Sequence, residues 1–102
     1  MGTKIIRYRG DNYPIEAKLT RNGSWSLDGS TVKITIVFND DGVDNTVTGT
    51  VTDEPNKIVE FATTSAIINS VRDGTYDIQV DDGSYIYTHL SGEISIISDI
   101  TP

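Results

Sequence analysis

The chain has 102 residues, of which 15 are acidic and 8 are basic, so its net charge at pH 7 is −7, and it contains no cysteine. A chain of this length folds as one domain around a single core, and without cysteine it has neither a disulfide framework nor a thiolate metal site. The acidic balance argues against nucleic acid and anionic membranes as partners, because both repel a negative surface.

We therefore expect one domain over residues 1–102, with loose termini at 1–3 and 99–102. The N-terminal stretch Met1–Arg7 has only two adjacent apolar residues before a charge, which does not match the apolar region of a signal peptide. No apolar run approaches the length of a membrane span. These features predict a protein that is made in the cytosol and stays soluble.

The first half of the chain predicts short strands, because apolar and polar residues alternate between clusters of turn-forming residues. The expected strands are Lys4–Tyr8, Pro14–Thr20, Thr31–Phe38, Thr46–Thr52 and Ile58–Phe61. The third is the clearest, since every second residue from Val32 to Phe38 is apolar and belongs in the core. The fourth is rich in threonine, and we expect it at a sheet edge.

The segment Thr63–Val71 departs from this alternation. Ala66, Ile67 and Ile68 are consecutive, and Thr64 or Ser65 could cap a turn of helix. We expect one short helical turn within Thr64–Ser70 that crosses between two sheets.

The C-terminal stretch 74–97 predicts three consecutive strands. Tyr76–Val80 alternates in period two, and Asp82-Gly83 suits a tight hairpin turn. A second strand is expected at Ser84–Leu90, and Ser91-Gly92 is expected to end it before a third run through Ile94 and Ile96. Three such strands predict an antiparallel meander that forms one sheet.

About seven to eight short strands with regular turn signals are typical of an all-β, immunoglobulin-like antiparallel β-sandwich. The Cys-Trp-Cys pattern of antibody domains is missing, so only the architecture is implied.

Two motifs suggest ligands but are better explained by turns. Arg9-Gly10-Asp11 spells an integrin-recognition tripeptide, yet Gly-Asp between two strands is ordinary turn chemistry. The segment Asn39–Asn45 contains three aspartates, but it lacks the spacing and the twelfth-position Glu of a calcium loop. We expect no metal.

His89 is the only histidine, and no nucleophile elbow, phosphate loop or zinc-protease motif is present. We therefore expect no catalytic residue and no cofactor, and a protein that is not an enzyme.

The aromatic run near the C-terminus suggests a protein-interaction surface. If Ile86, Thr88 and Leu90 point to the core, Tyr85, Tyr87 and His89 point outward and form an amphipathic patch. The alternative reverses the faces, with the tyrosines inside and Ile86 and Leu90 covering an edge. Trp25 is a second candidate anchor, with a core-capping Trp as its alternative.

Four runs in matching order resemble a known family. They are Arg-Gly-Asp-Asn-Tyr-Pro-Ile at 9–15, Leu-Asp-Gly-Ser-Thr-Val-Lys at 27–33, Gly-Thr-Tyr-Asp-Ile-Gln-Val at 74–80 and Tyr-Thr-His-Leu-Ser-Gly-Glu-Ile at 87–94. Together they resemble the N-terminal immunoglobulin-like domain of phage baseplate upper proteins, over about Ile6 to Asp99.

The resemblance implies a structural virion component, made in the host cytoplasm, that docks on other tail or baseplate subunits and is a homo-oligomer in the particle. It carries over no catalytic residue. In that family the domain is usually followed by coiled or helical segments that lead to a trimeric fibre, whereas this sequence ends at Pro102, so fibre linkage is left open. The alternatives are a carbohydrate-binding or adhesive module, which would expose Trp25, Tyr85 and Tyr87, and an inert linker domain.

Overall fold

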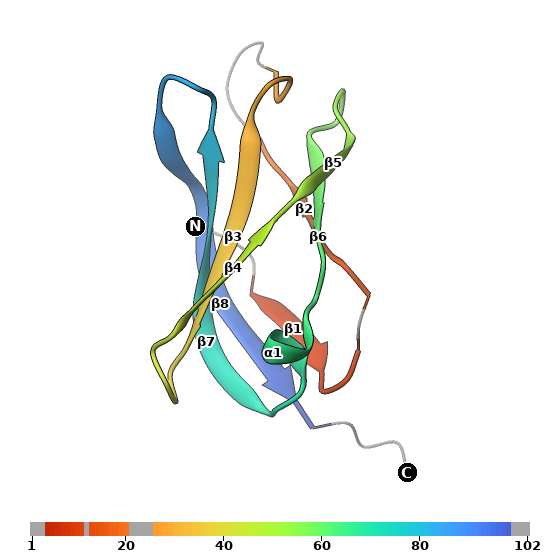
Figure 1. Cartoon of the computed structure of the whole chain (residues 1–102). Helices are drawn as coiled ribbons and strands as arrows, with labels where there is room; N and C mark the ends of the chain where they lie inside the picture. Colours follow the sequence, from red (N-terminus) through yellow and green to blue (C-terminus); the bar gives the residue numbers. More distant parts are fainter. Residues whose placement is uncertain (1–3, 12, 21–25, 99–102) are drawn as a thin grey trace.

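The computed structural model describes residues 4–11, 13–20 and 26–98. It confirms the all-β prediction, since the strands form two sheets that face one another across a common core (Figure 1). The five-stranded sheet has the order β1 (Ile5–Tyr8), β8 (Ile86–Ile97), β7 (Arg72–Asp81), β3 (Thr31–Phe38) and β4 (Asp44–Thr48). The three-stranded sheet has the order β2 (Ile15–Lys18), β6 (Ile58–Phe61) and β5 (Thr50–Asp53).

The core lies between the sheets, and β3 shows how the sequence builds it. Val32, Ile34, Ile36 and Phe38 are each at most 2% exposed, as their period-two alternation predicts. From the facing sheet, Val59 and Phe61 of β6 are fully buried. Burying one such aliphatic or aromatic side chain contributes roughly 1.5–3 kcal/mol to stability.

The predicted helical turn is confirmed as α1 (Ser65–Ile68), in the connection between β6 and β7. Ile67 and Ile68 are buried against the core, which is why this segment lacks strand alternation. The Ile68 carbonyl accepts a hydrogen bond from the Gly10 N–H at 2.8 Å, which links α1 to the β1–β2 connection.

The predicted strand Thr46–Thr52 is wrong in one respect, because the chain changes sheets in its middle. β4 belongs to the five-stranded sheet and β5 to the three-stranded sheet, and only Gly49 separates them. A Cβ atom on Gly49 would lie 2.6 Å from side-chain atoms of both Phe61 and Val59. Because Gly49 has no side chain, the chain can pass close to Phe61 and Val59 as it goes from one sheet to the other. Both strands lie at sheet edges, as predicted.

The predicted break at Ser91-Gly92 is also wrong, since β8 is one strand of 12 residues that includes both Ser91 and Gly92. Gly92 pairs with Tyr76 of β7, and a Cβ there would lie 3.0 Å from the Tyr76 ring. The glycine thus makes room for a large side chain and does not end a strand. The expected meander is a two-stranded β7–β8 hairpin, and β1 pairs parallel with the end of β8, from Ile5↔Ile94 to Tyr8↔Ile97.

Candidate protein-interaction site

The β7–β8 connection, Asp81–Ile86, is termed here the hairpin tip, and its turn is fixed by its own carboxylates. Oδ1 of Asp82 accepts hydrogen bonds from the N–H groups of Ser84 (2.9 Å) and Tyr85 (2.8 Å). Oδ1 of Asp81 accepts one from the N–H of Gly83 (2.9 Å), whose φ of 94° favours glycine. The predicted Asp-Gly turn is thus present and held in one shape.

The hairpin tip presents two apolar side chains to solvent. Tyr85 is 74% exposed and Ile86 is 67% exposed, the highest values among the exposed large hydrophobic residues of the described part of the chain. A pocket of about 580 Å³ lies at the base of the tip, between Asp82, Tyr85 and His89 among others. Exposed apolar side chains on a fixed turn are typical of an interface anchor.

A β-bulge at His89 decides which aromatic side chains are exposed. Leu90 pairs with Ile78 and Thr88 pairs with Gln79, so His89 is an extra residue in β8. Each bulge of this kind shifts the alternation by one position. Val80 on the core face is therefore opposite Tyr87, whereas Ile86 is opposite Asp81 on the outer face.

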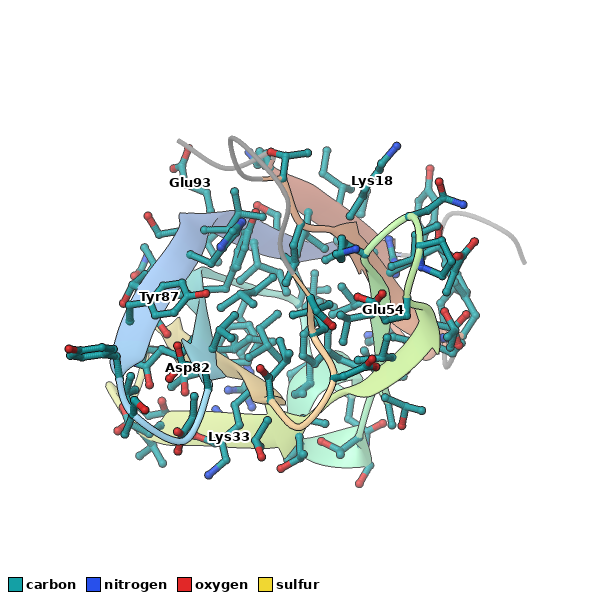
Figure 2. All side chains as sticks on the ribbon, turned by 90° about the horizontal axis from the view of Figure 1, so that it is seen from above. Lys18, Lys33, Glu54, Asp82, Tyr87 and Glu93 are labelled. Carbon is teal, nitrogen blue, oxygen red and sulfur yellow. The ribbon has the colours of Figure 1, made fainter. Side chains whose placement is uncertain are left out.

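The expected aromatic patch is therefore only partly present. Tyr87 packs against the core and points between the sheets (Figure 2), and its ring lies 6.2 Å from that of His89. Both side chains are half-buried, and of the three Tyr85 is the exposed one. Ile86 outside and Tyr87 inside agree with the reversed assignment of the faces, whereas Leu90 packs against the core as in the other assignment. Trp25 lies outside the described residues.

The two long edges of the sandwich differ. On one edge the chain itself passes from β4 to β5, which joins the sheets. On the other edge β1 pairs only with the residues of β8 from Ile94 to Ile97. Within the described residues, the outer side of β8 from Ile86 to Glu93 therefore carries no paired strand.

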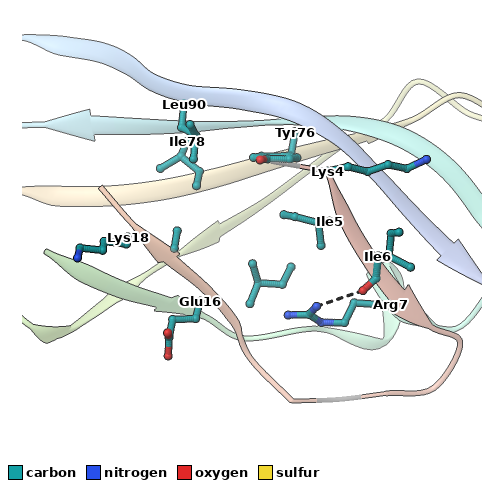
Figure 3. A pocket seen from close by; sticks show the side chains of 11 residues that line it. Lys4, Ile5, Ile6, Arg7, Glu16, Lys18, Tyr76, Ile78 and Leu90 are labelled. Atoms are coloured by element: carbon teal, nitrogen blue, oxygen red, sulfur yellow. Dashed lines mark hydrogen bonds between the residues drawn. The ribbon is translucent and has the colours of Figure 1, made fainter. Parts of the chain in front are cut away.

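A groove of about 560 Å³ opens at this second edge, between β1, β2 and the five-stranded sheet (Figure 3). This edge groove has an apolar floor that includes Ile5, Ile78 and Leu90. Tyr76 also lines it, and burial raises the pKa of the Tyr76 hydroxyl above its ordinary value. The groove thus offers apolar surface beside a stretch of β8 with which no strand of the described residues pairs.

The rim of the edge groove is basic although the protein is acidic. Lys4, Arg7 and Lys18 line it, against one carboxylate, Glu16. Arg7 is engaged internally, since its guanidinium lies 4.3 Å above the Tyr13 ring and donates to the Ile6 carbonyl (Figure 3). Lys4 and Lys18 are exposed, and the ion pairs found in the described part of the chain do not include them.

Arg9-Gly10 and Asn39–Asp41 lie in turns, whereas Asp44 and Asn45 of the second motif begin β4. Gly10 has a φ of 88°, and the Asp11 N–H donates to the Tyr8 carbonyl. Asp40 and Asp41 both approach the Arg72 guanidinium, at 3.8 and 3.6 Å. No group of three or more acidic, His or Cys side chains in the described ranges is placed to hold a metal ion.

Comparison with known proteins yields no assignment. No family model matches the chain, and no curated protein sequence is significantly similar to it. Across residues 4–98 apart from the two gaps, no helix is both long enough and apolar enough to cross a membrane.

Proposed function

We propose that this protein is a non-enzymatic structural module of a bacteriophage virion, part of a tail, baseplate or related appendage, that acts through protein–protein contacts. The observation that carries the proposal is the hairpin tip, where Tyr85 and Ile86 project from a turn held by Asp82. A turn that is already fixed loses little conformational freedom on docking. Tyrosine is effective at interfaces because it buries a large area with few rotatable bonds.

We propose further that the sandwich is immunoglobulin-like. The strand order supports this, because β2, β6 and β5 would correspond to strands B, E and D, and β3, β4, β7 and β8 to strands C, C′, F and G. Tyr76 adds support. It is buried in β7 two residues before Ile78, the spacing of the tyrosine that precedes the second cysteine in immunoglobulin domains.

The resemblance to the immunoglobulin-like domain of phage baseplate upper proteins supports the virion role. Two of its four runs, 74–80 and 87–94, lie in β7 and β8, the strands that carry the hairpin tip. The family's mode of action, docking between virion subunits, requires an exposed anchor and no catalytic group. The exposed pair Tyr85 and Ile86 meets that requirement.

The test is the presence of the chain in phage particles. Particles from a lysate of the strain that encodes it are purified by density gradient and examined by mass spectrometry and by immunogold labelling with antibodies against the purified domain. We expect peptides of the chain in stoichiometric amount and gold at one end of the tail. Particles that lack the chain, with all of it in the soluble fraction, would contradict the virion role.

The pocket at the base of the hairpin tip favours a carbohydrate-binding module as the second candidate, because Tyr85 and Asp82 combine an aromatic face with a carboxylate. A glycan array separates the two functions. Binding of a defined glycan that is lost in Tyr85→Ala would favour the sugar binder. An inert linker domain would give neither glycan binding nor incorporation into particles.

A further inference from the structure

We propose that the edge groove of one copy receives the hairpin tip of a second copy, so that the protein assembles head to tail. This inference rests on the proposed function and names the partner of the tip. The apolar surfaces match in kind, since the tip offers Tyr85 and Ile86 and the groove floor offers Ile5 and Leu90, which are half-buried. Docking would remove both from water.

Charge complementarity identifies a second copy as the occupant. The tip carries Asp81 and Asp82, and the groove rim carries Lys4 and Lys18. Two copies of a chain with a net charge of −7 repel one another in most orientations. The orientation that brings the acidic tip to the basic rim is therefore the one that electrostatics favours, and both halves of this contact are present on one chain.

The backbone beside the groove adds to the fit. Within the described residues, no strand pairs with the outer side of β8 from Ile86 to Glu93. An exposed strand edge pairs readily with another chain. The incoming tip would thus meet a strand edge as well as apolar contact.

The positions of the two surfaces determine the kind of assembly. The tip lies at one end of an elongated molecule of 47 × 26 × 21 Å, whereas the groove lies along its β1–β2 edge (Figure 1). A contact between two different surfaces is heterologous, and it generates a ring if the rotation closes or a filament if it does not. A modest contact repeated around a ring gains strength from multivalency, which suits a tail or baseplate.

The test uses the purified protein and two variants that change exposed side chains only. The tip variant is Tyr85→Ser with Ile86→Ser, and the groove variant is Lys18→Glu. Matched controls are Val43→Ser with Val71→Ser, which are 56% and 53% exposed, and Arg9→Glu, an exposed residue that lines neither the groove nor the pocket at the tip. Circular dichroism confirms that each variant is folded.

Sedimentation of the wild type up to about 1 mM, the weak end of specific association, is expected to show mass that rises with concentration. Each variant should self-associate at least about tenfold more weakly, and the controls should match the wild type. A mixture of the two variants should form a 1:1 dimer, because it retains one intact tip and one intact groove.

Three results would overturn the proposal: a wild type that stays monomeric throughout, a tip variant that still associates, or a mixture that forms no dimer. If copies instead associated symmetrically, tip to tip, the mixture of the two variants would form no 1:1 dimer, because the tip variant has no intact tip. None of these results decides whether the chain is in the virion, which the particle analysis measures separately, so the two proposals fail independently.

Discussion

The backbone N–H of Leu27 donates a hydrogen bond of 3.0 Å to Oε2 of Glu54, which joins the segment before β3 to the β5–β6 turn. The same oxygen lies 3.1 Å from Nζ of Lys57. The Leu27 hydrogen bond and then the Lys57 contact lower the pKa of the Glu54 carboxyl from its ordinary value. One carboxylate thus connects two loops at the same end of the sandwich.

This link predicts a loss of stability at acid pH. Since the pKa of Glu54 is lower in the folded state, its contribution is present above the unfolded pKa and is lost as the pH falls through the folded pKa. Hydrogen bonds from Asn56 lower the pKa of Asp53 as well, which adds in the same direction. Glu54→Gln removes the charge and keeps an acceptor, so thermal unfolding of this variant should have a lower midpoint at pH 7.

The difference between Glu54→Gln and the wild type should shrink as the pH is lowered from about 5 to 3, where the carboxyl takes up its proton. Glu93→Gln on the outer face of β8 is the control and should follow the wild type. A difference that stays constant across this range would show that the charge of Glu54 does not stabilise the fold.

Gly74→Ala is expected to destabilise the β3–β7 pair. A Cβ at this position would clash with the Val37 carbonyl oxygen and lie 2.9 Å from the Cα of Phe38, and backbone cannot move aside as a side chain can. Urea unfolding should show a loss of about 2–3 kcal/mol, a typical cost of overpacking. Thr75→Ala, at the next and exposed position, should stay within about 0.5 kcal/mol of the wild type. Equal stability of the two variants would refute the steric argument.

Deleting His89 should leave the β7–β8 hairpin paired, because β8 has one residue more than β7 at the bulge and His89 is that extra residue. Leu90 would then follow Thr88 directly, and Tyr87 would stay on the core face in regular alternation. We expect a stability change of no more than about 1 kcal/mol. NMR should show unchanged contacts between Tyr87 and the core. A Tyr87 that becomes exposed, or a hairpin that melts, would show that the bulge is required for the pairing.

Arg72 is expected to stabilise the fold by packing more than by ion pairs. Its guanidinium lies 4.2 Å above the Phe38 ring, whereas its carboxylate partners, Asp40 and Asp41, are largely exposed. Arg72→Lys should therefore cost roughly 1 kcal/mol, because an ammonium group does not stack on the ring. Asp40→Asn with Asp41→Asn should cost no more than about 0.5 kcal/mol per pair. Chemical denaturation in high salt, which screens the ion pairs, is the control. A larger loss of unfolding free energy in the aspartate variant than in Arg72→Lys would show that the ion pairs matter more than the packing.

The sequence predicted what depends on local pattern. The alternation from Val32 to Phe38 gave β3 and its core face, and the consecutive Ile67 and Ile68 marked the helical turn. What the sequence did not predict depends on distant partners. Gly49 carried no prediction and Gly92 was expected to end a strand, yet Gly49 permits a change of sheet beside Phe61 and Gly92 makes room for Tyr76.

The candidate site shows the same division. Asp82-Gly83 predicted the turn, because a tight turn follows from residue type. The exposure of Tyr85 was one of two face assignments that the sequence left open. The bulge at His89 follows only from the pairing with β7, and no turn residue marks it. Strict alternation across that point places Tyr87 on the face opposite Leu90 in either assignment, whereas the bulge puts both against the core. The edge groove had no sequence signal, because it depends on how far β1 extends along β8.

The parallel pairing of β1 with β8 has a mechanical consequence. A pull that draws Ile5 and Ile97 apart acts along the two strands, so the hydrogen bonds from Ile5↔Ile94 to Tyr8↔Ile97 share the load in shear. An antiparallel hairpin pulled at its open end would instead unzip one bond at a time. Tension applied across the domain in this direction therefore meets its firmest resistance at the first and last strands, before the core is strained.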